Sequence, residues 1–331
     1  MKRICSIDGA SEEAQCEGRP KDCKRHDNAR QRSNSAIGLL CMNNCKSITL
    51  EDSRTLSYAE YGDPTGRPVI YFHGMPASRL EGALFDRMAA NLGLRIIATD
   101  RPGFGQSSFQ PGRQINDTTD DIRQLSDQLQ LERFYVLGLS SGCPYALTTS
   151  WGSPERVIET TVMAGLGDFA NSRHAHEMPG FAKMTLRAAT RFPRTVERIY
   201  GTIVASLVKG NTALLRRLLG SASCQPDQAI WRNADIAEMI AASWQEAFAH
   251  TGRGPAYELT LLSKTWGFRP EEIRVPVHFW HGGQDHTVPV GMSREHHEKV
   301  PSSTLEIIPE EGHFSLPVRQ MERILAGFGW D

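Results

Sequence analysis

The sequence predicts an α/β fold in which helices cover both faces of a mostly parallel, doubly wound sheet. Unbroken apolar runs at residues 69–72, 95–99 and 134–137 are typical of strands that are buried on both faces. Segments with helical periodicity separate these runs, at residues 80–92 and after Asn116 or Asp117. This alternation of strands and helices predicts the crossover connections of a doubly wound sheet.

The other elements of the predicted sheet come from the same alternation. Residues 47–50 and 55–61 alternate apolar and polar side chains, which predicts an antiparallel hairpin with one face in water. A helix is expected through Ala146 and Leu147. Further strands are expected at residues 157–164, 277–280 and 304–308, and further helices at residues 290–299 and 316–329.

One long segment interrupts this rhythm. Residues 166–268 contain no convincing strand, but helical patterns occur at residues 182–191, 196–208 and 236–248. We expect this segment to form a helical cap over the C-terminal edge of the sheet. The α/β core is then made of residues 46–165 and 269–331.

The first 45 residues differ in composition from the rest of the chain. Charged and polar side chains dominate them, so residues 1–45 are expected to be a disordered extension. The apolar run at residues 37–40 is too short for a signal peptide. We hypothesise that Met42 is the natural start. Cys16, Cys23 and His26 lack the paired spacing of zinc ligands, so no metal is expected there.

Charge and cysteine usage exclude several classes of function. Among 331 residues, 37 are Lys or Arg and 38 are Asp or Glu, which argues against nucleic acid or an anionic membrane as a partner. No apolar run approaches the roughly 18 residues of a membrane span. Only Cys143 and Cys224 lie beyond residue 45, so the body of the chain is expected to be reduced and cytoplasmic. The oligomeric state cannot be predicted.

The segment Gly138-Leu139-Ser140-Ser141-Gly142 has the G-x-S-x-G form of a nucleophile elbow. It lies between a predicted buried strand and a predicted helix. The two glycines suit a turn too tight for a Cβ, and the turn would hold Ser140 on a strained corner with its hydroxyl exposed. Ser141 is one residue out of register, so its backbone N–H matters more than its side chain.

A serine nucleophile needs a base and an acid to orient that base. Asp285 and His313 each follow a predicted strand, and the carboxyl ends of parallel strands meet at one edge of a sheet. The order Ser140, Asp285, His313 also matches this architecture. Asp168 is a second candidate for the acid. The remaining candidate histidines are expected to be structural: His281 and His286 beside the acid, and His174 and His176 in the cap.

The loop after the predicted strand 69–72 is a candidate for binding an oxyanion. It reads His73-Gly74-Met75-Pro76, and its glycine permits a tight turn that directs backbone N–H groups into the site. The N–H groups of Met75 and Ser141 would form the oxyanion hole. His73 is expected to stabilise the turn rather than to carry a proton.

Over residues 46–331 the chain resembles the α/β-hydrolase superfamily and is similar to its esterase, aminopeptidase and carbon–carbon hydrolase branch. The matching motifs are the H-G-x-P loop, Asp100-Arg101-Pro102-Gly103-Phe104-Gly105-Gln106-Ser107, the elbow, Gly283-Gln284-Asp285 and Gly312-His313. The resemblance implies that Ser140 is the nucleophile, Asp285 the acid and His313 the base, with Met75 and Ser141 as oxyanion donors. Serine at the elbow disfavours epoxide hydrolases and haloalkane dehalogenases, which use aspartate there.

The predicted activity is hydrolysis of a small or medium-sized carboxylic ester through an acyl-enzyme, with a small-molecule substrate and no cofactor. Alternatives are an amide or carbon–carbon hydrolase on the same triad, a cofactor-free haloperoxidase or perhydrolase, and a non-catalytic ligand-binding protein. Gly103-Phe104-Gly105 lacks the third glycine of a dinucleotide loop. Candidate cap aromatics for the pocket, most of them expected to be packing residues, are Phe181, Trp231, Trp244 and Trp266.

Deletion of residues 1–41 is expected to leave both folding and activity intact, because this segment is predicted to add nothing to the buried core. Thermal unfolding followed by circular dichroism and an ester hydrolysis assay would measure this. Loss of either property would contradict the hypothesis that Met42 is the natural start.

Overall fold

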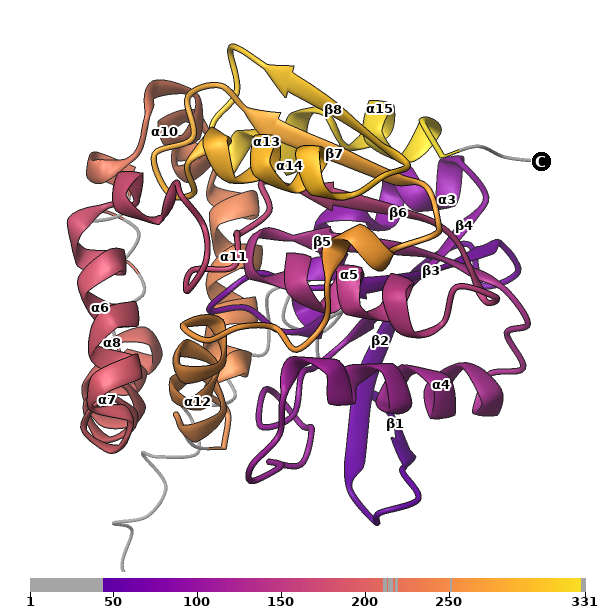
Figure 1. Ribbon diagram of the computed structural model, residues 1–331, viewed down its shortest axis with the longest axis horizontal. Helices are drawn as coiled ribbons and strands as arrows, with labels where there is room; N and C mark the ends of the chain where they lie inside the picture. Colours follow the sequence, from indigo (N-terminus) through magenta and orange to yellow (C-terminus); the bar gives the residue numbers. More distant parts are fainter. Residues whose placement is uncertain (1–43, 211–212, 214–216, 218–219, 251, 329–331) are drawn as a thin grey trace, which may run out of the picture. The chain divides into compact units, whose positions relative to one another are not determined.

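The computed structural model describes residues 44–331 except 211–212, 214–216, 218–219, 251 and 329–331, and in this part of the chain eight strands form one sheet (Figure 1). Its order is β1-β2-β4-β3-β5-β6-β7-β8. β2 pairs antiparallel with β1 and β4, whereas the other neighbouring strands are parallel. The strands are β1 (Lys46–Thr49), β2 (Thr55–Gly62), β3 (Arg67–Phe72), β4 (Leu94–Thr99), β5 (Phe134–Leu139), β6 (Val157–Met163), β7 (Val277–Gly282) and β8 (Ser303–Ile308). The predicted mostly parallel, doubly wound sheet is confirmed.

The predictions that concern residues 1–43 fall outside the residues that the structure describes. These include nearly all of the expected extension 1–45, the hypothetical start at Met42, and the cysteines and histidine weighed as zinc ligands. The described residues all belong to one compact unit, Cys41–Asp331.

Helices outside the segment 166–268 connect the strands in the predicted alternation. They are η1 (Arg79–Phe85), α3 (Asp86–Asn91), η2 (Ile115–Asp117), α4 (Thr118–Gln128), η3 (Ser140–Gly142), α5 (Cys143–Gly152), η6 (Pro270–Glu272), α13 (Val290–Lys299), α14 (Ser315–Arg319) and α15 (Met321–Ala326). Two predicted helices are divided. The first begins as the 3₁₀ turn η1, where Gly82 packs so closely against the ring of Tyr61 that a Cβ would lie 2.7 Å from it. The second breaks at Gln320, between α14 and α15.

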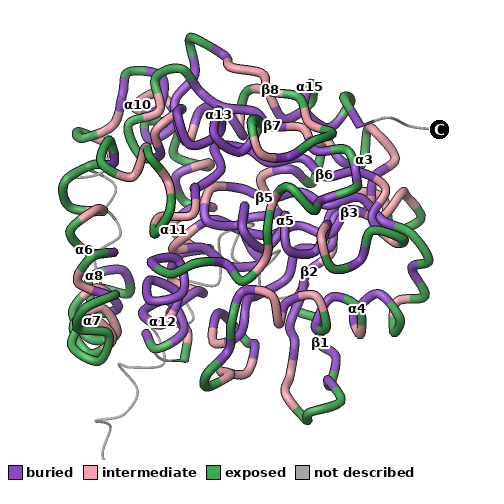
Figure 2. Tube along the Cα trace, in the orientation of Figure 1, coloured by how far each residue is buried: buried purple, intermediate pink, exposed green. Residues whose placement is uncertain are grey.

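Both faces of the sheet are buried, as the apolar runs predict. In β3, Ile70 and Phe72 pack into one core cluster, and Val69 and Tyr71 into the cluster on the opposite face. Figure 2 shows the central strands as buried, with exposure concentrated on the loops and outer helices. Because the parallel strands share a direction, the loops that follow them emerge at one edge.

Between β6 and β7, every element in the described residues of 166–268 is helical. The elements are η4 (Ala175–Glu177), α6 (Gly180–Arg191), α7 (Pro193–Ile199), the π-helix η5 (Tyr200–Val204), α8 (Ala205–Gly210), α10 (Gln225–Arg232), α11 (Ala234–Ala247) and α12 (Arg253–Leu262). The sequence patterns had not predicted α10 and α12. We refer to these helices as the cap.

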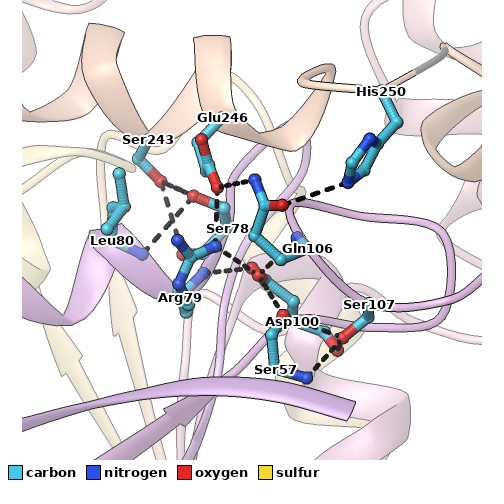
Figure 3. A network of polar contacts seen from close by, with 10 residues as sticks. All are labelled: Ser57, Ser78, Arg79, Leu80, Asp100, Gln106, Ser107, Ser243, Glu246 and His250. Carbon is cyan, nitrogen blue, oxygen red and sulfur yellow. Dashed lines mark hydrogen bonds and ion pairs between the residues drawn. The ribbon is translucent and has the colours of Figure 1, made fainter. Parts of the chain in front are cut away.

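A polar network joins the cap helix α11 to the edge of the sheet (Figure 3). The Nη1 atom of Arg79 donates to Asp100 Oδ2 over 2.6 Å and to Glu246 Oε1 over 2.7 Å. The side chain of Arg79 is 4% exposed and that of Asp100 is fully buried. The backbone N–H of Ser78 donates to the Ser243 hydroxyl on α11. The cap is therefore attached to the loops after β3 and β4 by paired buried groups.

A second buried network surrounds Glu258 of the cap helix α12. One carboxylate oxygen lies 3.1 Å from Arg101 Nε, and the other accepts from Arg113 Nη2 over 2.6 Å. The Tyr145 hydroxyl also donates to Glu258, over 2.8 Å. The two guanidinium groups and the carboxylate are each at most 2% exposed. Glu258 is thus the carboxylate that compensates two buried positive charges.

Replacing Glu258 by Ala is expected to lower the free energy of unfolding by about 3–5 kcal/mol, because two guanidinium groups then stay buried without their anion. Urea unfolding followed by fluorescence measures the change. Glu238→Ala, at an exposed position of α11, is the control and should change stability by less than about 0.5 kcal/mol. Equal losses in both variants would contradict this account.

Candidate active site

Ser140 lies at the sharp turn between β5 and the helical segment η3–α5. Its φ angle is +55°, a left-handed conformation that residues other than glycine seldom adopt. Because the turn starts a helix directly after a buried strand, it holds the serine side chain at the C-terminal edge of the sheet. Such backbone strain is common at functional sites.

The two glycines of the elbow are required by close packing. A Cβ on Gly138 would lie 2.8 Å from the Cβ of Ala146, and one on Gly142 would lie 2.2 Å from the carbonyl oxygen of Phe72. The second contact is with backbone, which cannot move aside as a side chain can. The glycines therefore allow the turn to lie directly against the end of β3.

Asp285 and His313 form a hydrogen-bonded pair. His313 Nδ1 lies 2.7 Å from Asp285 Oδ2. The other oxygen, Oδ1, accepts from the backbone N–H groups of Thr287 and Val288 over 2.7 and 2.8 Å. His281 Nε2 lies 3.3 Å from Asp285 Oδ2. With its proton on Nδ1 directed at the carboxylate, His313 keeps Nε2 available as a base.

Burial and charge act in opposite directions on this pair. Burial alone lowers the pKa of His313, but the adjacent Asp285 carboxylate, together with the charges of Asp227 and Glu81, outweighs it and holds that pKa above the usual 6.5. For Asp285, burial favours the neutral form, but His313 and His281 hold its pKa well below the usual range. Asp285 is therefore ionised at neutral pH and stabilises an imidazolium on His313.

The backbone that carries His313 is held by a cap residue, Asp227 of α10. Its Oδ2 accepts from the His313 N–H over 3.0 Å, and its Oδ1 accepts from Phe314 and Ser315 N–H over 2.9 and 2.8 Å. Asp227 is 2% exposed. It satisfies the free N–H groups at the start of α14 and thereby sets the position of the histidine.

Arg101 orients the loop predicted to bind an oxyanion. Its Nη1 donates to the His73 carbonyl over 2.5 Å and its Nη2 to the Gly74 carbonyl over 3.0 Å. In a trans peptide the N–H points away from the preceding carbonyl, so Arg101 turns the Met75 N–H to the opposite side. That N–H has no acceptor among the described residues. Ser141 is buried, with its hydroxyl 3.5 Å from Arg101 Nη2.

Ser140, Met75 and His313 line one cavity of about 60 Å³. The rest of its wall is made by Gly74, Glu81, Leu84, Leu139, Ile240, Trp244, Thr287, Phe314, Pro317 and Val318. Ligand pockets usually enclose about 300–1,000 Å³. A substrate larger than a few atoms therefore needs movement of the side chains that α11 contributes.

A family model for the alpha/beta hydrolase fold matches residues 67–320. The chain belongs to the α/β hydrolase family. It is 27% identical to "Probable proline iminopeptidase" of Streptomyces coelicolor, over 72% of this chain and 70% of that protein. It is 29% identical to "Dihydrolipoyllysine-residue acetyltransferase component of acetoin cleaving system" of Pseudomonas putida, over 44% of this chain but only 38% of the relative.

Solved structures show the same fold. An esterase from Exiguobacterium antarcticum aligns with a TM-score of 0.65 and 19% identity, over 85% of this chain and 97% of that one. In this fold, Ser140, Asp285 and His313 lie on the loops that follow the parallel strands β5, β7 and β8. In the described residues, no helix of this α/β hydrolase has the length and apolar character needed to cross a membrane.

Other residues weighed from the sequence have different surroundings in this α/β hydrolase. Asp168 accepts hydrogen bonds from Ala170 and Asn171 and makes none with His313. Burial and the charge of Arg101 hold the pKa of His73 well below 6.5, so this histidine is neutral. Within the described ranges, no group of three His, Cys, Asp or Glu side chains is arranged to hold a metal ion.

Of the four aromatic residues named as candidates for the pocket, Trp244 lines the cavity. Trp231 packs against Trp244 and Phe314, and Phe181 is 73% exposed. Sequence reasoning missed Asp227 and Glu81. Asp227 is far from His313 in the sequence and follows no strand. Glu81 lies eight residues after His73 and belongs to no motif that would mark it as a site residue.

Replacing Asp285 by Asn is expected to lower the pKa of His313, because burial is then opposed only by the charges of Asp227 and Glu81. NMR titration of the imidazole nitrogens measures both values. Asp235→Asn, at an exposed position of α11, should leave the His313 midpoint unchanged. An unchanged midpoint in Asp285→Asn would contradict the proposed electrostatic role.

Proposed function

We propose that this protein is a serine hydrolase that cleaves a small or medium-sized carboxylic ester through a covalent acyl-enzyme. The observation that carries the proposal is the 2.7 Å hydrogen bond between His313 Nδ1 and Asp285. His313 lines the same cavity as Ser140. A serine at the elbow and a histidine oriented by a buried carboxylate are the parts that acyl transfer requires.

In this mechanism the Ser140 hydroxyl attacks the ester carbonyl while His313 Nε2 takes its proton. The N–H groups of Met75 and Ser141 donate to the oxyanion of the tetrahedral intermediate. His313 then protonates the leaving alcohol, which departs and leaves the acyl group on Ser140. Water attacks this ester with His313 again as base, which releases the acid and restores the serine.

The buried carboxylate of Asp285 keeps the proton of neutral His313 on Nδ1 and stabilises the imidazolium formed in each half of the reaction. Its two backbone donors, Thr287 and Val288, hold its orientation. Asp227 has a positioning role through the backbone of His313. The substrate is a small molecule, because the cavity is enclosed by the core and α11.

Amide hydrolysis on the same residues is the second candidate. Several relatives named as proline iminopeptidases support it. One of them is the Streptomyces coelicolor protein, which aligns over 72% of this chain. The steps are unchanged, except that His313 must protonate an amine as it leaves. Comparing p-nitrophenyl esters with the p-nitroanilides of the same acyl groups distinguishes the two candidates.

Replacing Ser140 by Ala is expected to lower turnover by roughly 10³–10⁶-fold, which corresponds to about 4–8 kcal/mol of barrier. The measurement is hydrolysis of p-nitrophenyl esters of increasing chain length. The same variant should lose covalent labelling by a fluorophosphonate probe.

The matched control is Ser206→Ala, which removes a hydroxyl from an exposed position of the cap helix α8. It should keep both turnover and labelling. Near-normal activity in Ser140→Ala would rule the mechanism out.

A further inference from the structure

Glu81 is the one carboxylate among the residues that line the cavity beside Ser140 and His313. It lies in η1, directly after the loop that carries Gly74 and Met75, and it is 8% exposed. The mechanism proposed above does not use it. A carboxylate this deeply buried normally has a cation or several hydrogen-bond donors as partners.

Only one of its two oxygens is satisfied by the protein. Oε2 accepts from the Tyr71 hydroxyl over 2.6 Å and from the Gly74 N–H over 2.7 Å. Oε1 accepts from no donor among the described residues. Oε1 keeps some accessible surface, and Glu81 belongs to the wall of the cavity. The oxygen that lacks a protein donor is therefore available to a ligand in the cavity.

No protein cation neutralises this carboxylate by direct contact in the described part of the chain. Two positive charges act on it without contact, those of Arg101 and His313. The Nη1 and Nη2 atoms of Arg101 donate to the His73 and Gly74 carbonyls, and its guanidinium is ion-paired with Glu258. Burial raises the pKa of Glu81 above its usual 4.5. A bound cation would favour the ionised form, so the carboxylate and a positively charged ligand stabilise each other.

The free oxygen is close to the nucleophile. The point where a Cβ on Gly74 would stand is 3.5 Å from Glu81 Oε1 and 3.7 Å from the Cβ of Ser140. These two distances keep Glu81 Oε1 within about 7.2 Å of the Ser140 Cβ, and both residues line the same cavity. A separation of this size can accommodate a group that is a bond or two away from a carbonyl that Ser140 attacks.

We propose that Glu81 binds a protonated amine that the substrate carries next to its scissile carbonyl, so that the enzyme acts on amino-acyl esters or amides. This inference rests on the proposed function, because it takes Ser140 as the nucleophile. The amine donates to Oε1, while Tyr71 and Gly74 hold Oε2. The apolar walls from Leu84, Ile240 and Trp244 accept the rest of the acyl group.

The charge also has a role beside the oxyanion. An unpaired carboxylate near the oxyanion donors would oppose the negative charge that develops on the substrate oxygen. A substrate ammonium group between them removes that repulsion. With a neutral substrate only the charge on His313 and the distant Arg101 offset this repulsion, so the preference should appear in kcat as well as in KM.

The variant Glu81→Gln separates recognition from a structural role. Its amide oxygen can still accept from Tyr71 and Gly74, while an NH₂ group replaces the oxygen that faces the cavity. Gly74→Ala is a second variant. Its methyl group would occupy the space between Glu81 and Ser140, and its contacts of 3.5 Å or more involve no clash.

The experiment compares alanine p-nitrophenyl ester with p-nitrophenyl propionate, which has the same carbon chain without the amine. The wild-type enzyme should prefer the amino-acyl ester in kcat/KM by about 10- to 100-fold, as expected for a hydrogen bond to a charged group. Glu81→Gln should reduce this preference to about threefold or less. Gly74→Ala should also reduce it. Glu238→Gln, at an exposed position of α11, should preserve it.

A wild-type enzyme that does not prefer the amino-acyl ester would overturn the inference. A Glu81→Gln enzyme that slows both substrates equally would also overturn it and assign Glu81 a purely structural role. Binding of alanine methyl ester and methyl propionate to Ser140→Ala, measured by calorimetry, tests recognition without turnover. Failure of the fluorophosphonate to label Ser140 would instead contradict the proposed function, and this calorimetric comparison would still report on Glu81.

Discussion

Gly142 packs against the last residues of β3, so closely that a Cβ there would lie 2.2 Å from the Phe72 carbonyl oxygen. This contact joins the elbow of Ser140 to the loop that carries Gly74 and Met75. β3 and β5 are neighbours in the sheet, so the two loops emerge side by side. The positions of Ser140 and of the loop with Gly74 and Met75 therefore depend on a backbone-to-backbone approach that tolerates no side chain.

Three carboxylates of the cap, two of them buried and that of Glu246 half-buried, hold the loops of the core in place. Asp227 binds the backbone of His313, Glu246 pairs with Arg79, and Glu258 pairs with Arg101 and Arg113. Each comes from a different cap helix. Buried charges require well-defined partners, so these contacts specify one orientation of the cap over the sheet. Of these three helices, α11 also contributes Ile240 and Trp244 to the wall of the cavity.

Local patterns predicted the sheet well because their signals do not depend on distant parts of the chain. The apolar run at β3 reflects burial on both faces of a strand, and the helical period of α13 reflects burial on one face of a helix. The crossover helix expected at residues 80–92 is present, but its first half is the 3₁₀ helix η1, in which Gly82 packs closely against Tyr61. Such a contact between elements leaves no mark on local periodicity.

The sequence by itself determined the order of strands and helices and the loops on which Ser140, Asp285 and His313 lie, because periodicity and glycine spacing are properties of neighbouring residues. Only the tertiary structure decided which carboxylate meets His313, which oxygen of Glu81 stays free, and that Asp227 supports the histidine from the cap. Those outcomes depend on the packing of segments up to 88 residues apart, which sets burial and therefore the cost of leaving a polar group unpaired.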